Sequence, residues 1–131
     1  MADITTNILS NKVGQVLHLT LNRPEKKNAL TPAMYSDLSK ALTEAKGDFD
    51  IRVVVISGAG SAFTGGNDIL DFMDTPPTGP DSPGMQFLAV LHDFPKPLIA
   101  AVHGNAVGIG TTMLMHCDLV TANPDTKFSM P

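Results

Sequence analysis

The sequence predicts an α/β fold whose strands pair largely in parallel. Short apolar segments typical of strands alternate along the chain with segments of helical periodicity. Two helical segments begin with a hydroxyl residue followed by proline, and two apolar segments run directly into glycine-rich turns. With 131 residues, of which 43% are hydrophobic and 17% charged, the chain can bury one core. We therefore expect residues 1–131 to belong to one domain.

The first predicted strand spans residues 16–21. Leucine occupies every second position of this segment, which is the period of a strand with one buried face. The sequence Asn22, Arg23, Pro24 ends the strand, and a polar loop follows over residues 25–28.

A helix is predicted from Pro32 to about Lys46. Thr31 is a suitable N-cap, proline suits the first helical position, and Gly47 is a plausible stop. The apolar residues are spaced to share one helical face. The predicted core stripe consists of Met34, Leu38, Ala41, Leu42 and Ala45.

The middle of the chain combines a strand, two loops and a second helix. Residues 52–57 are rich in β-branched side chains, as in a strand buried on both faces, and residues 58–66 form a loop with four glycines. Several prolines between residues 74 and 84 exclude regular structure and predict a mobile surface loop. Ser82 and Pro83 then start a helix that reaches about residue 94.

The last third of the chain repeats the pattern of a strand followed by a glycine-rich turn. Residues 98–102 are predicted as a buried strand, residues 103–110 as the turn and residues 111–116 as the opening of a short helix. One more strand is expected over residues 118–122. The single cysteine, Cys117, has apolar neighbours and is interpreted as a core residue rather than a nucleophile.

Composition excludes several classes of protein. The net charge of −4 argues against binding of nucleic acid through a broad basic surface. The longest apolar runs are far shorter than the roughly 20 residues of a membrane span, so we expect no membrane partner. The N-terminus lacks the features of a secretory signal. We expect a cytoplasmic protein, with a peroxisomal location left open.

Familiar catalytic motifs fail on their physical requirements. Residues 60–66 have the glycines of a phosphate-binding loop, but Gly66 and Asn67 occupy the positions of its lysine and hydroxyl residue. Neither a dinucleotide-binding glycine motif nor a serine nucleophile elbow is present. The four histidines lack metal-ligand spacing, so no metal site is expected.

Two units in which a buried strand runs into a glycine-rich turn remain. Glycine lets the backbone approach a ligand closely, and the first N–H groups of a helix have no internal acceptor. Two such donors on one carbonyl oxygen would stabilise an enolate. By spacing alone, both turns could equally be tight connections. The units are VVVISGAGSAFTGGND and PLIAAVHGNAVGIGTT.

Three separated motifs occur in an order that is found in one enzyme family. On these motifs the chain resembles, over nearly its whole length, the crotonase family of enoyl-CoA hydratases and isomerases. The resemblance implies a spiral of ββα units that is incomplete at the C-terminus, and an acyl-CoA substrate, with no separate cofactor. The motifs are RPEKKNALTPAMYSDL, GAGSAFTGGNDIL and KPLIAAVHGNAVGIGTTMLMHCDLVTA, followed by TKFSMP.

The resemblance also implies roles for particular residues. The two backbone N–H groups of the family's oxyanion hole fall on Asn67, within TGGND, and on Ile109, within VGIG. Arg23, Lys26 and Lys27 are candidates for contact with CoA phosphates, although a solvated basic loop explains them too. The remaining positions implied in substrate binding are Ala29, Gly65, Gly66, Asp68, Ile69, Gly108 and Thr112. Asp68 is expected to hold the loop rather than to move protons.

One position departs from the family's hydratases. Their first catalytic glutamate corresponds to Thr112, whose hydroxyl cannot serve as a general base near neutral pH. The TGGND loop with an uncharged position 112 resembles the peroxisomal-type isomerases, which convert 3-enoyl-CoA to 2-enoyl-CoA with one acidic residue. A hydratase or another enolate-forming enzyme with acids placed elsewhere, and a non-catalytic CoA-thioester binder, are the alternatives.

The resemblance places the chain in the N-terminal half of the family's domain. The catalytic acid of the isomerases is therefore expected beyond Pro131. The family continues into a C-terminal helical region used for trimerisation, so a homotrimer or a dimer of trimers is expected for the full-length protein.

Overall fold

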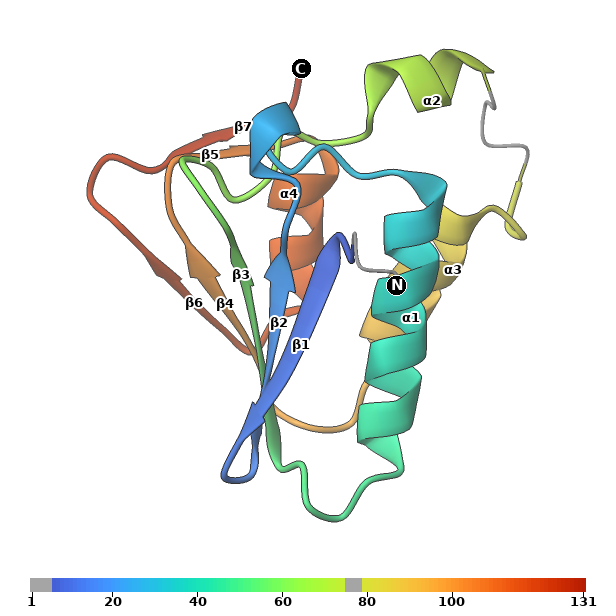
Figure 1. Cartoon of the computed structure of the whole chain (residues 1–131), viewed down its shortest axis with the longest axis vertical. Helices are drawn as coiled ribbons and strands as arrows, with labels where there is room; N and C mark the ends of the chain where they lie inside the picture. The colour runs from blue at the N-terminus through green and yellow to red at the C-terminus, as the bar shows by residue number, and fades with distance from the viewer. Residues whose placement is uncertain (1–5, 75–78) are drawn as a thin grey trace.

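A computed structural model describes residues 6–74 and 79–131. It has one main sheet, with helices on one side and a small second sheet at one end (Figure 1). The mixed α/β class predicted from the sequence is confirmed.

The main sheet has five strands in the order β1-β2-β3-β4-β6. The first pair is antiparallel, and every later pair is parallel, as predicted. Leu17, Leu19 and Leu21 are buried on the face that the sequence indicated. The strands are β1 (Ile8–Val13), β2 (Val16–Leu21), β3 (Val53–Gly58), β4 (Leu98–Val102) and β6 (Leu119–Ala122).

Helices α1 (Pro32–Lys46) and α3 (Pro83–Asp93) contact each other and cover one face of the sheet (Figure 1). Both predicted caps are confirmed, because the hydroxyls of Thr31 and Ser82 each accept from the backbone N–H three residues later. No helix within the described ranges has the length and apolar character needed to cross a membrane. The largest fully buried side chains of the core include Leu19, Leu38, Leu42, Ile56, Phe63, Phe87 and Leu98.

The small second sheet lies beside one end of the main sheet. Strands β5 (Asn105–Val107) and β7 (Lys127–Ser129) pair in parallel. Isolated parallel bridges join Leu30 to Asn67 and Thr64 to Ala106, which extends the same layer. Each of these segments follows a strand of the main sheet, so the chain winds as a spiral and places successive turns side by side.

Several predicted elements differ from the observed ones. Strands β1 and β5 were not predicted; β5 lies inside the predicted turn over residues 103–110. The helix expected from residue 111 begins at Ile109 as α4 (Ile109–Thr112) and continues as a 3-10 turn, η2 (Met113–His116). The polar loop after β2 contains a 3-10 turn, η1 (Pro24–Lys26).

The burial predictions need two corrections. Strand β3 is buried on one face only, since Val53 and Val55 are partly exposed on the side that has no helix. Cys117 is partly buried rather than fully buried, although burial and the nearby Asp118 charge raise the pKa of its thiol to about 11. That shift disfavours the thiolate, as expected for a cysteine that is not a nucleophile.

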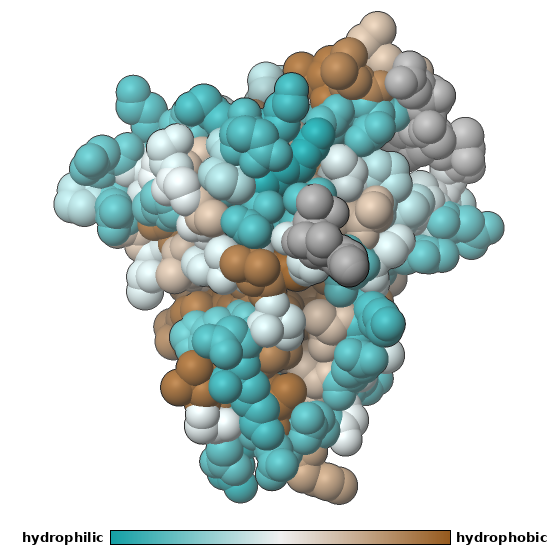
Figure 2. Space-filling model, viewed as in Figure 1, coloured by the Kyte–Doolittle hydropathy of each residue, from teal (hydrophilic) through white to brown (hydrophobic). Residues whose placement is uncertain are grey.

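The proline-rich region was predicted to be one loop from residue 74 to 84. It starts after a further helix, α2 (Ile69–Asp74), and ends at α3. Residues 75–78 lie outside the described residues. Figure 2 shows apolar surface at the top of the molecule, over α2. Ile69, Leu70 and Met73 are each more than 70% exposed there.

Candidate active site

The two glycine-rich turns lie against each other. The N–H groups of Phe63 and Thr64 donate to the Asn105 carbonyl at 3.1 and 3.2 Å, and the Val107 N–H donates to the Thr64 carbonyl at 3.0 Å. The structure thereby brings together the two units that the sequence singled out, from segments about 40 residues apart.

Two glycines allow this close approach. Gly104 has φ +66°, and a side chain there would collide with the Ser61 carbonyl. Gly66 has φ +93°, and a Cβ would lie 3.0 Å from the Val107 carbonyl oxygen. Glycine is needed at both positions for its backbone conformation and for its lack of a side chain.

The N–H of Asn67, the first predicted donor, has its direction fixed by the hydrogen bonds of the neighbouring peptides. The Gly66 carbonyl accepts from the Leu30 N–H at 2.8 Å, and the Asp68 N–H donates to the Leu30 carbonyl at 2.9 Å. Because a trans peptide unit points its N–H opposite to its C=O, the Asn67 N–H faces away from Leu30. It donates to no residue that the structure describes.

The second predicted donor, Ile109, begins α4. The Gly108 carbonyl accepts from the N–H groups of Thr111 and Thr112 at 2.9 and 3.0 Å and therefore points along the helix. The Ile109 N–H consequently points out of the N-terminal end, and it has no acceptor among residues 6–74 and 79–131. Both donors are thus held by fixed peptide planes and left without an internal partner.

The loop before α1 supports the first donor. Asn28 is fully buried, and its Nδ2 donates to the carbonyls of Ala59 and Ala62, each at 2.8 Å. The buried Thr64 hydroxyl donates to the Asn28 carbonyl at 2.6 Å and accepts from the Gly66 N–H at 3.1 Å. This chain of hydrogen bonds leads from the loop to the N–H of Gly66, the residue before Asn67.

Arg23 and Asp68 form an ion pair that ties the same loop to α2. Arg23 Nη1 lies 2.6 Å from Asp68 Oδ2 and also donates to the Ala29 carbonyl at 3.1 Å. Asp68 Oδ1 accepts from the Asp71 N–H at 3.0 Å. That backbone hydrogen bond and the Arg23 guanidinium hold the pKa of Asp68 below its usual value. Asp68 therefore links the loop before α1 to the start of α2.

The other predicted substrate-binding residues surround these supports. Lys26 and Lys27 are exposed, whereas Arg23 is partly buried by its ion pair. Gly65 is exposed and donates its N–H to the Lys27 carbonyl at 2.9 Å. Ile69 starts α2 directly after Asp68.

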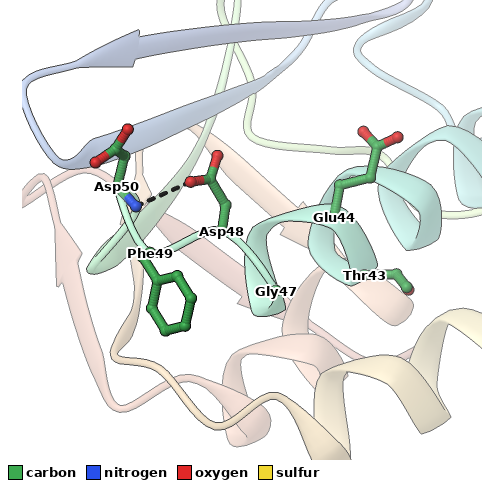
Figure 3. A pocket seen from close by; sticks show the side chains of 6 residues that line it. All are labelled: Thr43, Glu44, Gly47, Asp48, Phe49 and Asp50. Atoms are coloured by element: carbon green, nitrogen blue, oxygen red, sulfur yellow. Dashed lines mark hydrogen bonds between the residues drawn. The ribbon is translucent and has the colours of Figure 1, made fainter.

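One hollow of the described surface lies away from the turns. It occupies about 600 Å³ at the C-terminal end of α1, at the opposite end of the sheet from the turns (Figures 1 and 3). Three of its six lining residues are acidic, which opposes the phosphates of CoA, and Phe49 is almost fully exposed. We therefore place the site at the turns. The hollow is lined by Thr43, Glu44, Gly47, Asp48, Phe49 and Asp50.

Comparison with known proteins shows the family of the chain. The profile of the family described as Enoyl-CoA hydratase/isomerase matches residues 11–131. The chain belongs to that family. Human "Enoyl-CoA delta isomerase 2" is 38% identical over an alignment of 123 positions that covers 88% of this chain and 31% of that protein. Mouse mitochondrial "Delta(3,5)-Delta(2,4)-dienoyl-CoA isomerase" is 35% identical over 88% of this chain and 39% of its own length.

Solved structures of the family share the fold. The structure of Pseudomonas aeruginosa OdaA superposes with a TM-score of 0.94 at 51% identity, covering 97% of this chain and 51% of that one. Over the part of these relatives that it matches, the chain therefore has the crotonase-type spiral fold. It spans 31%, 39% and 51% of the lengths of these three relatives.

Thr112 faces the second turn and strand β7. Its hydroxyl donates to the Gly108 carbonyl at 3.2 Å and contacts Met130 Sδ at 3.4 Å. The Thr111 hydroxyl bonds the Ala106 and Ser129 carbonyls at 2.7 and 3.1 Å. Both threonines therefore brace the second turn against β7.

Sequence reasoning missed three residues of the site. Asn28, Thr64 and Tyr35 support the first donor by hydrogen bonds, yet Asn28 was assigned to a polar loop and Tyr35 was left out of the core stripe. A signal existed for Asn28, because asparagine tolerates the left-handed conformation that it adopts at φ 57°. The hydrogen-bond partners of Thr64 and Tyr35 are distant in the sequence, so no local sequence pattern indicates these two residues.

Proposed function

We propose that the protein binds an acyl-CoA thioester and stabilises its enolate with the backbone N–H groups of Asn67 and Ile109. The observation that carries this proposal is the pair of N–H groups on adjacent turns, each on a fixed peptide plane and each without an acceptor in the described chain. Donors held in place before reaction stabilise the charge that develops on a thioester oxygen without further reorganisation.

The reaction favoured is the conversion of a 3-enoyl-CoA to a 2-enoyl-CoA. A base removes a proton from the carbon beside the thioester, the charge delocalises onto the carbonyl oxygen, and the proton returns two carbons away. Thr112 argues against hydration by two glutamates, because its hydroxyl has no useful basicity and is engaged with Gly108. The isomerase names of the relatives support the same choice.

The phosphates of CoA are assigned to Lys26 and Lys27. Both side chains are exposed beside the first turn, whereas Arg23 is engaged with Asp68. Contacts with phosphates weaken in salt, so the affinity for CoA thioesters should fall with ionic strength, and less steeply in a Lys26→Ala, Lys27→Ala double variant. No metal or redox cofactor is needed, since backbone donors meet the enolate charge.

Calorimetry and an isomerisation assay test the proposal on the natural protein that contains these residues. Acetoacetyl-CoA should bind with measurable heat, and a 3-enoyl-CoA should gain the ultraviolet absorbance of a conjugated 2-enoyl thioester. Absence of binding would remove the basis of the assignment. Binding without turnover would favour a non-catalytic binder, and faster addition of water to a 2-enoyl-CoA would favour a hydratase.

A further inference from the structure

The side chain of Asn67 is tied to α1 by a hydrogen bond from the buried Tyr35 hydroxyl to Asn67 Oδ1. We propose that Tyr35 is a positioning residue that orients the Asn67 carboxamide, so that its Nδ2 rather than its Oδ1 faces the thioester oxygen. This inference rests on the proposed function and adds a residue that acts through the first donor.

The position of the Tyr35 hydroxyl is fixed by packing. The side chain is 6% exposed, and its ring lies 5.6 Å from the Phe87 ring centroid at an interplanar angle of 43°. On another side the ring lies beside Gly84, where an added Cβ would come into van der Waals contact with it. Burial raises the pKa of Tyr35 far above its usual value, which keeps the hydroxyl protonated and able to donate.

The direction of the hydrogen bond between Tyr35 and Asn67 follows from the groups present. A buried hydroxyl must place its proton on an acceptor, and Asn67 Oδ1 is the acceptor that the described structure provides. The oxygen and nitrogen of a carboxamide lie on opposite branches of one plane. With Oδ1 held toward α1, Nδ2 faces away from it, and it donates to no described residue.

The orientation matters because Asn67 also carries the first backbone donor. An Nδ2 near that N–H adds a positive dipole end beside the developing oxyanion. If the carboxamide turned over, Oδ1 would place a negative dipole end there and oppose the same charge. Tyr35 would therefore act on the chemical step more than on the binding of substrate.

A double-mutant cycle separates orientation from packing. Tyr35→Phe keeps the ring and removes the hydroxyl, so it should lower kcat by roughly three- to tenfold, the value of one intramolecular hydrogen bond, with little change in KM. In an Asn67→Ala background the same substitution should have no effect, because no carboxamide is left to orient. Activity of Tyr35→Phe equal to wild type, or an equal loss in both backgrounds, would overturn the inference.

A spectroscopic measurement reports directly on the hydrogen bonds from the donors to the thioester oxygen. The infrared carbonyl band of a bound, carbonyl-13C-labelled enoyl-CoA reports how strongly the oxygen is polarised. Tyr35→Phe should move the band toward that of free thioester, while its melting temperature stays near that of wild type. An unmoved band would also contradict the inference.

Asn67→Asp gives a second test that leaves Tyr35 intact. It replaces the amide nitrogen by a charged oxygen, so it should lower kcat well below that of Asn67→Ala. Equal activity of the two variants would contradict the inference. Failure of the wild-type protein to bind any acyl-CoA would instead overturn the proposed function, and that result is seen before any variant is made.

Discussion

Replacement of Asn28 should destabilise the fold more than any other single polar substitution near the site. Asn28 has no exposed surface, and its side chain joins the loop before α1 to the first glycine-rich turn. Oδ1 accepts from the Arg23 N–H at 2.8 Å, and Nδ2 donates to the Ala59 and Ala62 carbonyls at 2.8 Å. A third carbonyl, of Phe63, lies 3.2 Å from Nδ2.

The expected loss follows from these contacts. Asn28→Ala leaves one backbone N–H and two carbonyls without their partner, at a net value of about 1 kcal/mol for each hydrogen bond. Alanine tolerates φ 57° less well than asparagine, which adds up to about 1 kcal/mol. We predict a decrease of about 3–4 kcal/mol in the free energy of unfolding, a large part of the stability of an ordinary domain.

Urea unfolding of the natural protein containing this chain, followed by circular dichroism, measures the change. Asn28→Gly is the matched control, because glycine loses the same hydrogen bonds and accepts the left-handed conformation. It should be more stable than Asn28→Ala by up to about 1 kcal/mol. A loss of less than about 1 kcal/mol in Asn28→Ala would refute the view that this side chain holds the turn.

Four further predictions concern the site and its supports. Ile109→Pro should lower turnover by about a hundredfold to a thousandfold, while Ile109→Val should not, in steady-state assays of variants that circular dichroism shows to be folded. Thr112→Ala should keep most isomerase activity; loss of turnover with intact acyl-CoA binding would make Thr112 a participant. Lys96→Met should lower stability by about 3 kcal/mol in urea unfolding, because Lys96 Nζ donates to three carbonyls at 2.5–2.7 Å. The pKa of Asp68 is lowered in the folded protein. The stability that its carboxylate contributes should therefore be complete above about pH 4 and be lost as the pH falls through the folded pKa. An acid-unfolding curve unchanged by Asp68→Asn would contradict that assignment.

The Ile109 variant is a clean test because of the local backbone. Gly108 has φ 59° and ψ −117°, the mirror image of the extended conformation that residues before proline adopt. Proline also suits the first position of a helix, and no acceptor in the described chain loses a bond when the N–H is removed.

The sequence predicted those elements whose determinants are local. Alternating leucines predicted β2. A hydroxyl residue at the N-cap followed by proline predicted both long helices, α1 and α3, to within a residue or two. Strand β1 was missed because it is polar and exposed beyond Ile8 and depends on pairing with β2. Strand β5 was missed because its three residues lie in a glycine-rich segment and are set by β7.

The same division applies to the candidate site. The resemblance to the crotonase family supplied the two donor positions, and those still await a test by experiment. The hydrogen bonds that hold them could not be predicted, because they join residues far apart in the sequence, such as Asn28 to Ala62 and Tyr35 to Asn67. The ion pair of Arg23 with Asp68 likewise joins residues far apart in the sequence.

The spiral winding explains why the two proposed donors lie on neighbouring turns. Each turn of the chain adds a parallel strand to the main sheet and then a short extended segment to the second layer, so successive glycine-rich turns become neighbours there. Leu30 fixes the first peptide plane from one side, and α4 fixes the second from within its own helix. The loop before α1 has two roles. Its backbone and Asn28 hold the first turn, and the side chains of Lys26 and Lys27 stay exposed for an anionic ligand. Mutation of those lysines should therefore alter affinity and its salt dependence while leaving the donors in place, whereas mutation of Asn28 should disturb the donors as well as the fold.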